Sequence, residues 1–281
     1  MRFRTEIETF RADSIGPDDS ILFLGSCFAD NMGARLREYG FDVTHNPLGP
    51  LFNPASIAAA LGRAMERRSY VAADFMEHDG IYHAMDWAAR YQSPSAGVLA
   101  EAVNRDFTTL CEALERARII FITFGTAYAY HINGSGAIAG NCHKLPASTF
   151  HRSILSIDDV CRMWRPLLQR LREAGKRVIL TVSPVRHVAD GLHGNNISKA
   201  TLLLATEALE TEYFPAYEIL CDDLRDYRFY AADLKHPSDT AIDYIYEKFA
   251  DTYFSAATKE TIRGRYAAFL RAAHRPGNNT L

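Results

Sequence analysis

The sequence predicts an α/β fold, a three-layer αβα sandwich built on a mainly parallel, doubly wound sheet with hairpin insertions. Short runs of consecutive apolar residues, such as residues 21–24 and 119–124, have the pattern of strands that are buried on both faces. Segments with apolar residues at helical spacing alternate with these runs. Alternating strands and helices are typical of a parallel sheet that carries helices on both sides.

The elements are expected in the following order. A first strand at residues 21–24 leads into a helix at 29–39, which Gly40 ends. Asn53 and Pro54 begin the next helix, because Asn is a favoured N-cap and Pro fits the first helical position. The remaining expected elements are strands at 41–44, 119–124, 178–182 and 217–221, helices at 98–116, 157–174, 198–213, 237–254 and 258–273, and hairpins at 75–86 and 128–140 that turn at residues 79–80 and 133–136.

Length and composition indicate one globular unit. The chain has 281 residues, of which 48% are hydrophobic and 23% charged, and a chain of this size can bury a large core. Because no repeat, low-complexity tract or long linker divides it, we expect a single domain over residues 1–281. Its expected additions are insertions near 75–86 and 128–140 and a C-terminal helical segment at 255–281.

Charge and cysteine content exclude several classes of protein. The net charge of −3 lacks the basic excess that nucleic-acid binding usually needs, and no run of about 18 apolar residues could span a membrane. The N-terminus has no apolar signal-peptide core. Five widely spaced cysteines without a C-x-x-C motif fit a reducing compartment, so we expect a cytoplasmic protein. The sequence does not define an oligomeric state.

Metal and nucleotide sites are not expected either. Ten histidines are scattered along the chain, and neither H-x-x-x-H nor H-E-x-x-H occurs. The chain also lacks the glycine-rich motifs that cradle phosphates. We therefore expect no metal and no cofactor.

Ser26 is the leading candidate for a nucleophile. Ligands of parallel sheets bind at the carboxyl ends of the strands, and Ser26 directly follows the first strand. Gly25 would relieve crowding in a tight turn, and the N-terminus of the next helix would offer free N–H groups to an oxyanion. The alternative is that Ser26 only caps that helix.

A base and an orienting acid are expected near the C-terminus. The segment at 233–237 reads D-L-K-H-P, and Pro237 fits the first position of a helix. His236 would then lie at the N-terminal edge of that helix, where the helix dipole keeps an imidazole neutral. Asp233 could bind its other ring nitrogen. The alternative is an ordinary surface loop, because short motifs match by chance.

Together, G-S after the first strand and D-x-x-H-P before a late helix resemble the SGNH hydrolase superfamily. Residues 25–29 spell G-S-C-F-A, and the chain resembles the GSCFA-domain family. Further matching segments lie at 46–49, 124–127, 141–144, 183–187 and 233–237. The resemblance implies an SGNH-like or flavodoxin-like sandwich in which Ser26 is the nucleophile, His236 the base and Asp233 the orienting acid.

One departure from the superfamily concerns the oxyanion hole. The superfamily's G-x-N block places an Asn side chain there, whereas residues 125–127 read G-T-A, and Ala127 has no donor. We expect the N–H groups of Ser26 and Gly49 to contribute, with Asn141 or His143 as the missing donor. Asn141 could instead form a turn, His143 could be structural, and Gly49 could be a plain turn residue.

Other residues at the strand ends are expected to bind the substrate. These are Gly125, Thr126, Arg186 and His187. An arginine there would suit a carboxylate, a phosphate or a sugar hydroxyl, although an ion pair or packing role is equally open. Cys27, beside Ser26, could have a lowered pKa, but we favour an inert buried thiol.

These residues predict a serine ester hydrolase that works through an acyl-enzyme. By analogy with SGNH relatives, its substrate is an acetyl or short acyl ester of a carbohydrate or small metabolite. The alternatives are an acyltransferase that uses the same site and a non-catalytic module that binds a glycan or metabolite. The expected partner is therefore a small-molecule or glycan ester.

Overall fold

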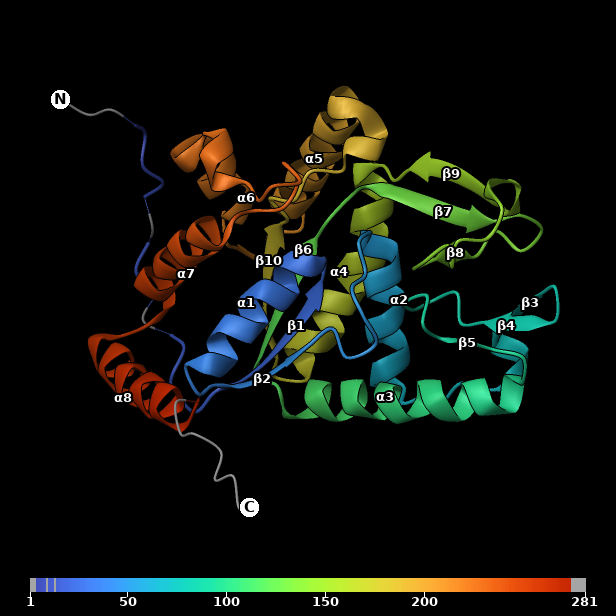
Figure 1. The fold of residues 1–281 in the computed structure, drawn as a ribbon, viewed down its shortest axis with the longest axis horizontal. Coiled ribbons are helices and arrows are strands. Elements are labelled where there is room, and N and C mark those ends of the chain that lie inside the picture. Colours follow the sequence, from blue (N-terminus) through green and yellow to red (C-terminus); the bar gives the residue numbers. More distant parts are fainter. Residues whose placement is uncertain (1–3, 9, 13, 274–281) are drawn as a thin grey trace, which may run out of the picture.

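The computed structural model describes residues 4–8, 10–12 and 14–273, and its centre is a five-stranded sheet (Figure 1). The strands lie in the order β11-β10-β6-β1-β2, and each neighbouring pair is parallel. Numbered by sequence, this is the flavodoxin-like order 2-1-3-4-5. The predicted doubly wound parallel sheet is confirmed. The strands are β1 (Ser20–Gly25), β2 (Asp42–His45), β6 (Ile119–Phe124), β10 (Arg177–Val182) and β11 (Glu212–Tyr213).

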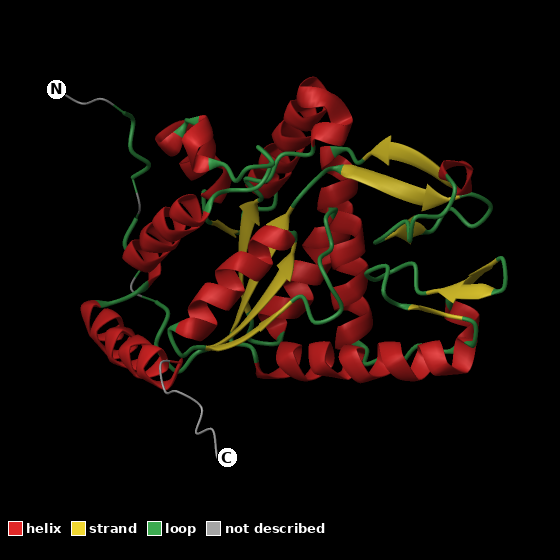
Figure 2. Cartoon of the chain, viewed as in Figure 1, coloured by secondary structure: helices red, strands yellow, loops and turns green. Residues whose placement is uncertain are grey.

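Helices cover both faces of this sheet, as Figure 2 shows. One face packs against α2 (Pro54–Met65), α3 (Ala96–Arg116), α4 (Ile157–Glu173) and α5 (Gly191–Ala208). The other face packs against α1 (Cys27–Glu38), α7 (Asp239–Tyr253) and α8 (Ala256–Ala273). These layers form the predicted three-layer sandwich.

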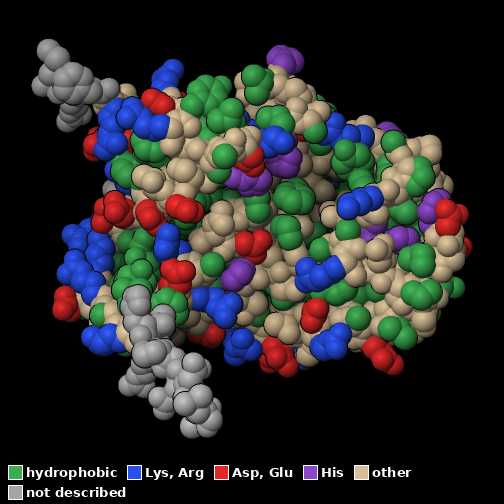
Figure 3. Space-filling view, in the orientation of Figure 1, with side chains coloured by type: hydrophobic (Ala, Val, Ile, Leu, Met, Phe, Trp, Pro, Cys, Tyr) green, Lys and Arg blue, Asp and Glu red, His purple; other side chains and the backbone are tan. Residues whose placement is uncertain are grey.

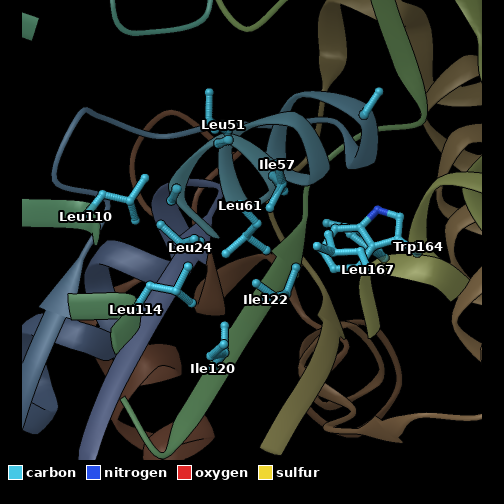
Figure 4. Packing of buried hydrophobic residues seen from close by; sticks show 14 of the residues in the cluster. Leu24, Leu51, Ile57, Leu61, Leu110, Leu114, Ile120, Ile122, Trp164 and Leu167 are labelled. Atoms are coloured by element: carbon cyan, nitrogen blue, oxygen red, sulfur yellow. The ribbon is translucent and has the colours of Figure 1, made fainter. Parts of the chain in front are cut away.

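Successive side chains along each strand point to opposite faces of the sheet, so each face has its own hydrophobic core. In β6, Ile120 and Ile122 point toward α2, α3 and α4, where Leu61 and Trp164 pack beside them (Figure 4). Phe121, between them in sequence, belongs to the core of the opposite face. Each fully buried side chain of this kind contributes about 1.5–3 kcal/mol, so the sheet is held firmly on both sides.

Side-chain caps fix where the helices begin. Asn53 accepts a hydrogen bond from Ser56 N at 2.8 Å, so the expected start of α2 at Asn53 and Pro54 is confirmed. Ser26 caps α1, and Ser238 caps α7. Each such cap stabilises its helix by about 1 kcal/mol.

Two small antiparallel sheets lie outside the central sheet and beside each other at the right of Figure 1. The first contains β3 (Met76–His78), β4 (Ile81–His83) and β5 (Gln92–Ser93). The second contains β7 (Tyr128–Ile132), β8 (Ile138–Ala139) and β9 (Phe150–Ile154). Both predicted hairpins are present, and each gains a third strand that the sequence analysis missed. Gly140 N and Asn141 N both donate to Met85 O and join the two sheets.

The predictions for residues 212–213 and 217–221 are wrong. The segment expected as a strand at 217–221 is helical: it forms α6 (Ala216–Glu218) and the start of a π-helical turn, η4 (Ile219–Leu224). The fifth strand of the sheet is instead β11, which lies within the helix predicted at 198–213. The physical reason is spacing: Ala216, Ile219, Leu220 and Leu224 are buried and recur at helical intervals. Short 3₁₀ turns complete the described chain: η1 (Ala72–Asp74), η2 (Ala147–Thr149), η3 (Val188–Asp190) and η5 (Tyr227–Phe229).

Within the described ranges, every helix is too short or too polar to cross a lipid bilayer.

Candidate active site

Ser26 lies between the end of β1 and the start of α1. Gly25 precedes it with φ of +133°, and a Cβ on Gly25 would lie 2.1 Å from Thr123 O, so only glycine fits this turn. Ser26 is 1% exposed. The local sequence therefore holds the Ser26 hydroxyl at the carboxyl edge of the sheet.

The Ser26 hydroxyl makes two hydrogen bonds. It accepts one from Phe28 N at 3.3 Å, so the capping interpretation holds. It donates the other to Ser183 Oγ at 3.0 Å, and Ser183 directly follows β10. Ser26 is thus both a helix cap and a group shared between two strand ends.

Asp233 and His236 form a close pair. Nδ1 of His236 donates to Oδ2 of Asp233 at 2.6 Å, while Oδ1 accepts from the N–H groups of Lys235 and His236. These donors hold the pKa of the Asp233 carboxyl well below its ordinary value. The proton on Nδ1 leaves Nε2 as an acceptor, and Nε2 has no hydrogen-bond partner among the described residues.

The position of His236 relative to α7 differs from the prediction. Ser238, not Pro237, begins the helix as its N-cap and accepts from Ala241 N, so α7 starts at Asp239. Pro237 instead pairs with Tyr230 in an isolated bridge. His236 therefore lies outside the first turn, and its tautomer is set by Asp233 and not by a helix dipole.

The loop that carries Asp233 and His236 is attached to the segment after β10. Arg186 N donates to Lys235 O at 3.1 Å, and the Arg186 guanidinium lies 4.1 Å from the centre of the Tyr230 ring and 5.1 Å from that of Tyr227. Arg186 was expected to bind substrate. Its side chain is occupied by these two tyrosines, and it holds the loop in place.

A cavity of about 270 Å³ lies at this edge. Predicted site residues Thr126, Asn141 and His187 line it, and Phe52 O accepts the N–H groups of Gly125 and Thr126 at its wall. Figure 3 shows histidine side chains beside a hollow near the middle of the face in view. The other lining residues are Asn53, Tyr128, Tyr130, Ala139, Gly140, Cys142, Arg152, Ala189 and Asp190.

Two asparagine side chains are among the residues that line this cavity. Oδ1 of Asn141 accepts from His143 N at 2.8 Å, and Oδ1 of Asn53 is the cap of α2. These bonds fix which way each amide points, and each NH₂ group has no partner in the part of the chain that the structure describes. Asn53, which lines this cavity, was not among the predicted site residues, because its capping role explained its presence in the sequence.

Two expected oxyanion donors are occupied. Gly49 N donates to Asn46 O at 2.8 Å within a turn, which is the plain-turn alternative. Nε2 of His143 lies 3.0 Å from Ala84 O and 3.1 Å from Trp87 O, so this ring holds the first insertion in place. Burial lowers the pKa of His143, which keeps the ring neutral there.

The backbone N–H of Ser26 is also engaged. It donates to Thr123 O at 3.3 Å, near the long end of the range for such bonds. A ligand oxygen would have to compete with this contact.

His187 and Cys27 are both held in uncharged forms. Burial, together with the neighbouring Lys199, lowers the pKa of His187 to about 4, and its Nε2 is buried without a partner among the described residues. Burial raises the pKa of the Cys27 thiol, which agrees with an inert side chain. No cluster of three or more His, Cys, Asp or Glu side chains that could hold a metal occurs in the described ranges.

A polar face of α5, which the sequence analysis missed, holds these strand ends. Asn195 Oδ1 accepts from His187 N at 3.0 Å, and Ser198 Oγ accepts from Ala127 N at 2.7 Å. Lys199 contacts backbone carbonyl groups nearby. All three side chains are buried at spacings of three and four residues. Ser198 and Lys199 lay at the start of the helix predicted at 198–213, whereas Asn195 lay outside it, because α5 begins earlier than predicted, at Gly191.

The fold and site therefore define an α/β sandwich with a polar site at the carboxyl edge of its parallel sheet. Residues 20–249 match the GSCFA family, and the chain belongs to this family. No curated protein matches the chain.

Solved structures similar to this chain include two esterases. One is the psychrotrophic esterase EstA from Pseudoalteromonas sp., inhibited by monoethylphosphonate, with 10% identity and a TM-score of 0.42 over 84% of this chain and 96% of that one. The other is a variant of Axe2, an acetyl-xylooligosaccharide esterase from Geobacillus Stearmophilus, with 14% identity and a TM-score of 0.38 over 84% and 94% of the two chains. Likenesses this distant say nothing of the activity of this chain.

Proposed function

We propose that this protein is a serine ester hydrolase that works through an acyl-enzyme. The observation that carries the proposal is the 2.6 Å contact between His236 Nδ1 and Asp233 Oδ2, which leaves Nε2 as a base. The loop that holds this pair is hydrogen-bonded to the segment after β10, and the same segment contains Ser183, the acceptor of the Ser26 hydroxyl. Nucleophile, base and orienting acid thus belong to adjoining segments.

The reaction has two balanced steps. Ser26 Oγ attacks the ester carbonyl carbon while His236 Nε2 takes the hydroxyl proton, and the bond to the alcohol oxygen then breaks as His236 returns that proton to the leaving alcohol. A water molecule attacks the acyl-enzyme in the same way and restores Ser26. Asp233 stabilises the imidazolium formed in each step. The Ser26 hydroxyl must first rotate away from Ser183.

The amide NH₂ groups of Asn53 and Asn141 are the two candidates for the side-chain donor to the oxyanion. Each is oriented by a backbone N–H group that occupies its Oδ1 atom. Asn53 is favoured over Asn141, because its neighbour Phe52 is bonded to the strand end that adjoins Ser26. Phe52 O accepts the N–H groups of Gly125 and Thr126, and a Cβ built on Gly125 would lie 3.3 Å from the Ser26 Cβ. One such donor is worth about 3 kcal/mol in other enzymes.

The proposed substrates are acetyl or short acyl esters of a carbohydrate or small metabolite. The adjacent cavity of about 270 Å³ is just below the range of pockets that hold drug-sized ligands. A long acyl chain would also have to cover Arg152 and Asp190, which would lose water without gaining hydrogen bonds. Thr126 and His187, which line this cavity, are the proposed binding residues.

A fluorophosphonate probe tests the proposal directly. It should label the wild type on Ser26, located by peptide mass spectrometry, and labelling should vanish in Ser26→Ala and fall strongly in His236→Ala. Ser135→Ala, which changes an exposed serine in the β7–β8 turn, is the control and should label like the wild type. Failure of the folded wild type to label at any pH would overturn the proposal.

A binding module is the second candidate, and two observations favour it. Ser26 donates to Ser183 and not to His236, and Ala127 stands where the superfamily's Asn would be. A binding module would bind an acetylated sugar without cleaving its ester. Mass spectrometry of the sugar after incubation with the protein would then detect only the intact ester. An acyltransferase would use the same site and differ in passing the acyl group to an added alcohol faster than to water.

A further inference from the structure

Lys199 is a buried lysine that the catalytic steps above do not use. It lies in α5 and is 2% exposed. Its Nζ donates hydrogen bonds to Gly125 O at 2.6 Å and to Ser183 O at 2.7 Å. Gly125 follows β6 and Ser183 follows β10, which are neighbours in the sheet. One amine therefore joins the ends of two strands.

Both of these strand ends touch Ser26. Ser183 Oγ accepts the Ser26 hydroxyl at 3.0 Å. On the other side, a Cβ built on Gly125 would lie 3.3 Å from the Ser26 Cβ. A shift of either carbonyl group away from Lys199 would therefore change the space in which the Ser26 hydroxyl turns.

The number of acceptors around Nζ matches a neutral amine. A neutral amine has two N–H groups, and the described structure offers Nζ two acceptors, the carbonyl oxygens of Gly125 and Ser183. A charged ammonium has three N–H groups, and its third would have no acceptor in a fully buried position. Leaving a charged donor unsatisfied in the interior is costly.

The surroundings of Lys199 offer only limited compensation for a charge: the centre of the Tyr217 ring lies 5.9 Å from Nζ, at the outer limit of a cation–π contact. The one carboxylate that acts on it, Asp190, is already paired with Arg152. The titratable and charged groups that face Lys199 come from every side: Cys27 from α1, His187 after β10, Asp190 before α5, Tyr217 in α6 and Cys221 in η4. Complete burial lowers the pKa of Lys199 to about 7.

We propose that Lys199 is a positioning residue that holds the carbonyl groups of Gly125 and Ser183 beside Ser26, and that the site works only when this amine is neutral. The proposal rests on the proposed serine chemistry. Protonation of Lys199 places a positive charge near His187. Lys199 and His236 both lower the pKa of His187 through their charges. The ammonium also carries a third N–H group with no acceptor among the described residues, which favours movement of Nζ away from the carbonyl groups of Gly125 and Ser183.

The pH dependence of fluorophosphonate labelling tests this role. In the wild type, both the base and Lys199 must be deprotonated, so the logarithm of the labelling rate should fall with a slope of about two at low pH. Lys199→Met should label about 10- to 100-fold more slowly, because misplaced reacting groups cost rate, and its slope should be about one. Lys176→Met is the matched control: Lys176 is at the surface and also binds a backbone carbonyl, Glu115 O at 2.5 Å.

Two results would overturn the proposal. One is a Lys199→Met protein that labels at the wild-type rate. The other is a slower variant with the wild-type slope, because a purely structural role would leave the slope unchanged. Lys176→Met should keep both rate and slope.

A measurement on the unmodified protein covers the case in which Lys199→Met does not fold. The ¹³Cε resonance of Lys199 in the wild type should titrate with a midpoint near 7. A midpoint near the ordinary lysine value of 10.5 would overturn the proposal. This titration does not depend on esterase activity. If the probe fails to label at any pH while Lys199 titrates near 7, then the proposed serine chemistry is wrong, but the lowered pKa of Lys199 is confirmed.

Discussion

The hydroxyl groups of Ser26 and Ser183 lie 3.0 Å apart, and Ser26 is the donor. The proton that catalysis must pass to His236 is therefore bound to a different acceptor in the resting structure. Ser183 Oγ is itself held by Val185 N at 3.2 Å, so it is a fixed acceptor. The reactivity of Ser26 depends on how easily this contact breaks.

Ser183→Ala should therefore increase the reactivity of Ser26. A neutral hydrogen bond contributes about 0.5–1.5 kcal/mol, so its loss should speed fluorophosphonate labelling about 2- to 10-fold. The backbone carbonyl of Ser183, which Lys199 binds, is unchanged by this substitution. Initial labelling rates at one pH are the measurement. A rate below that of the wild type would mean that Ser183 orients Ser26 productively and does not compete with His236.

Asn53→Asp should remove an oxyanion donor without removing a helix cap. Asp caps helices as well as Asn does, so the free energy of unfolding should change little. The hydrolysis rate kcat for a short acyl ester should fall about 100- to 1000-fold, the usual cost of one oxyanion donor.

Asn141→Asp is the matched control, because it puts the same charge in the same cavity and keeps the acceptor for His143 N. We expect it to lower kcat by less than about tenfold. Equal losses in the two variants would show that charge, and not the Asn53 donor, caused the effect.

The fold could be predicted because its strands and helices carry strong local signals. The β6 segment, which is rich in β-branched and aromatic residues and is followed by Gly125, indicates a strand, and the capping pair Asn53 and Pro54 indicates the start of a helix. Residues 217–221 could not be assigned in this way, since a short apolar run fits a strand or a buried helix equally well. The third strands of the two insertions, β5 and β9, depend on pairing partners distant in the chain.

The candidate site could be predicted only in part, for a different reason. Ser26, Asp233 and His236 stand in recognisable local motifs. The contacts of Lys199 depend on where α5 lies against two strand ends 74 and 16 residues away in sequence, so no local pattern shows them. Gly49 was suggested by resemblance and His143 by its place after the second hairpin, and the backbone partners of both became visible only in three dimensions.

The free energy of unfolding should depend on pH through Lys199. Its pKa is about 7 in the folded chain and has an ordinary value of 10.5, so between these values the folded state binds fewer protons. Stability from this group therefore rises with pH across this window, by at most about 1.4 kcal/mol per unit, and is flat below it.

Denaturant unfolding at several pH values, in wild type and Lys199→Met, measures this contribution. Burial raises the pKa of Cys27 and Cys221, and these thiols act in the opposite direction at alkaline pH. Both thiols are present in both proteins, and Lys199 lowers the pKa of each, so the difference between the two proteins measures the lysine together with its coupling to these thiols. A difference that stays constant from pH about 7 to about 10 would contradict the lowered pKa.

Arg186→Lys should loosen the loop that carries Asp233 and His236. The planar Arg186 guanidinium lies 4.1 Å from the centre of the Tyr230 ring, and a lysine cannot reproduce this stacking. A contact of this kind is worth about 0.5–2 kcal/mol, so labelling of Ser26 should slow about 2- to 30-fold through His236. Arg90→Lys is the control, because Arg90 stacks on Tyr91 at 4.6 Å in the region of the first insertion. If Arg186 bound the substrate instead, its replacement would raise KM for a charged ester while leaving labelling by a small neutral probe unchanged. A positioning role predicts slower labelling by the small probe, and a substrate-binding role predicts unchanged labelling. Comparing the labelling rates of the wild type and Arg186→Lys therefore decides between the two roles.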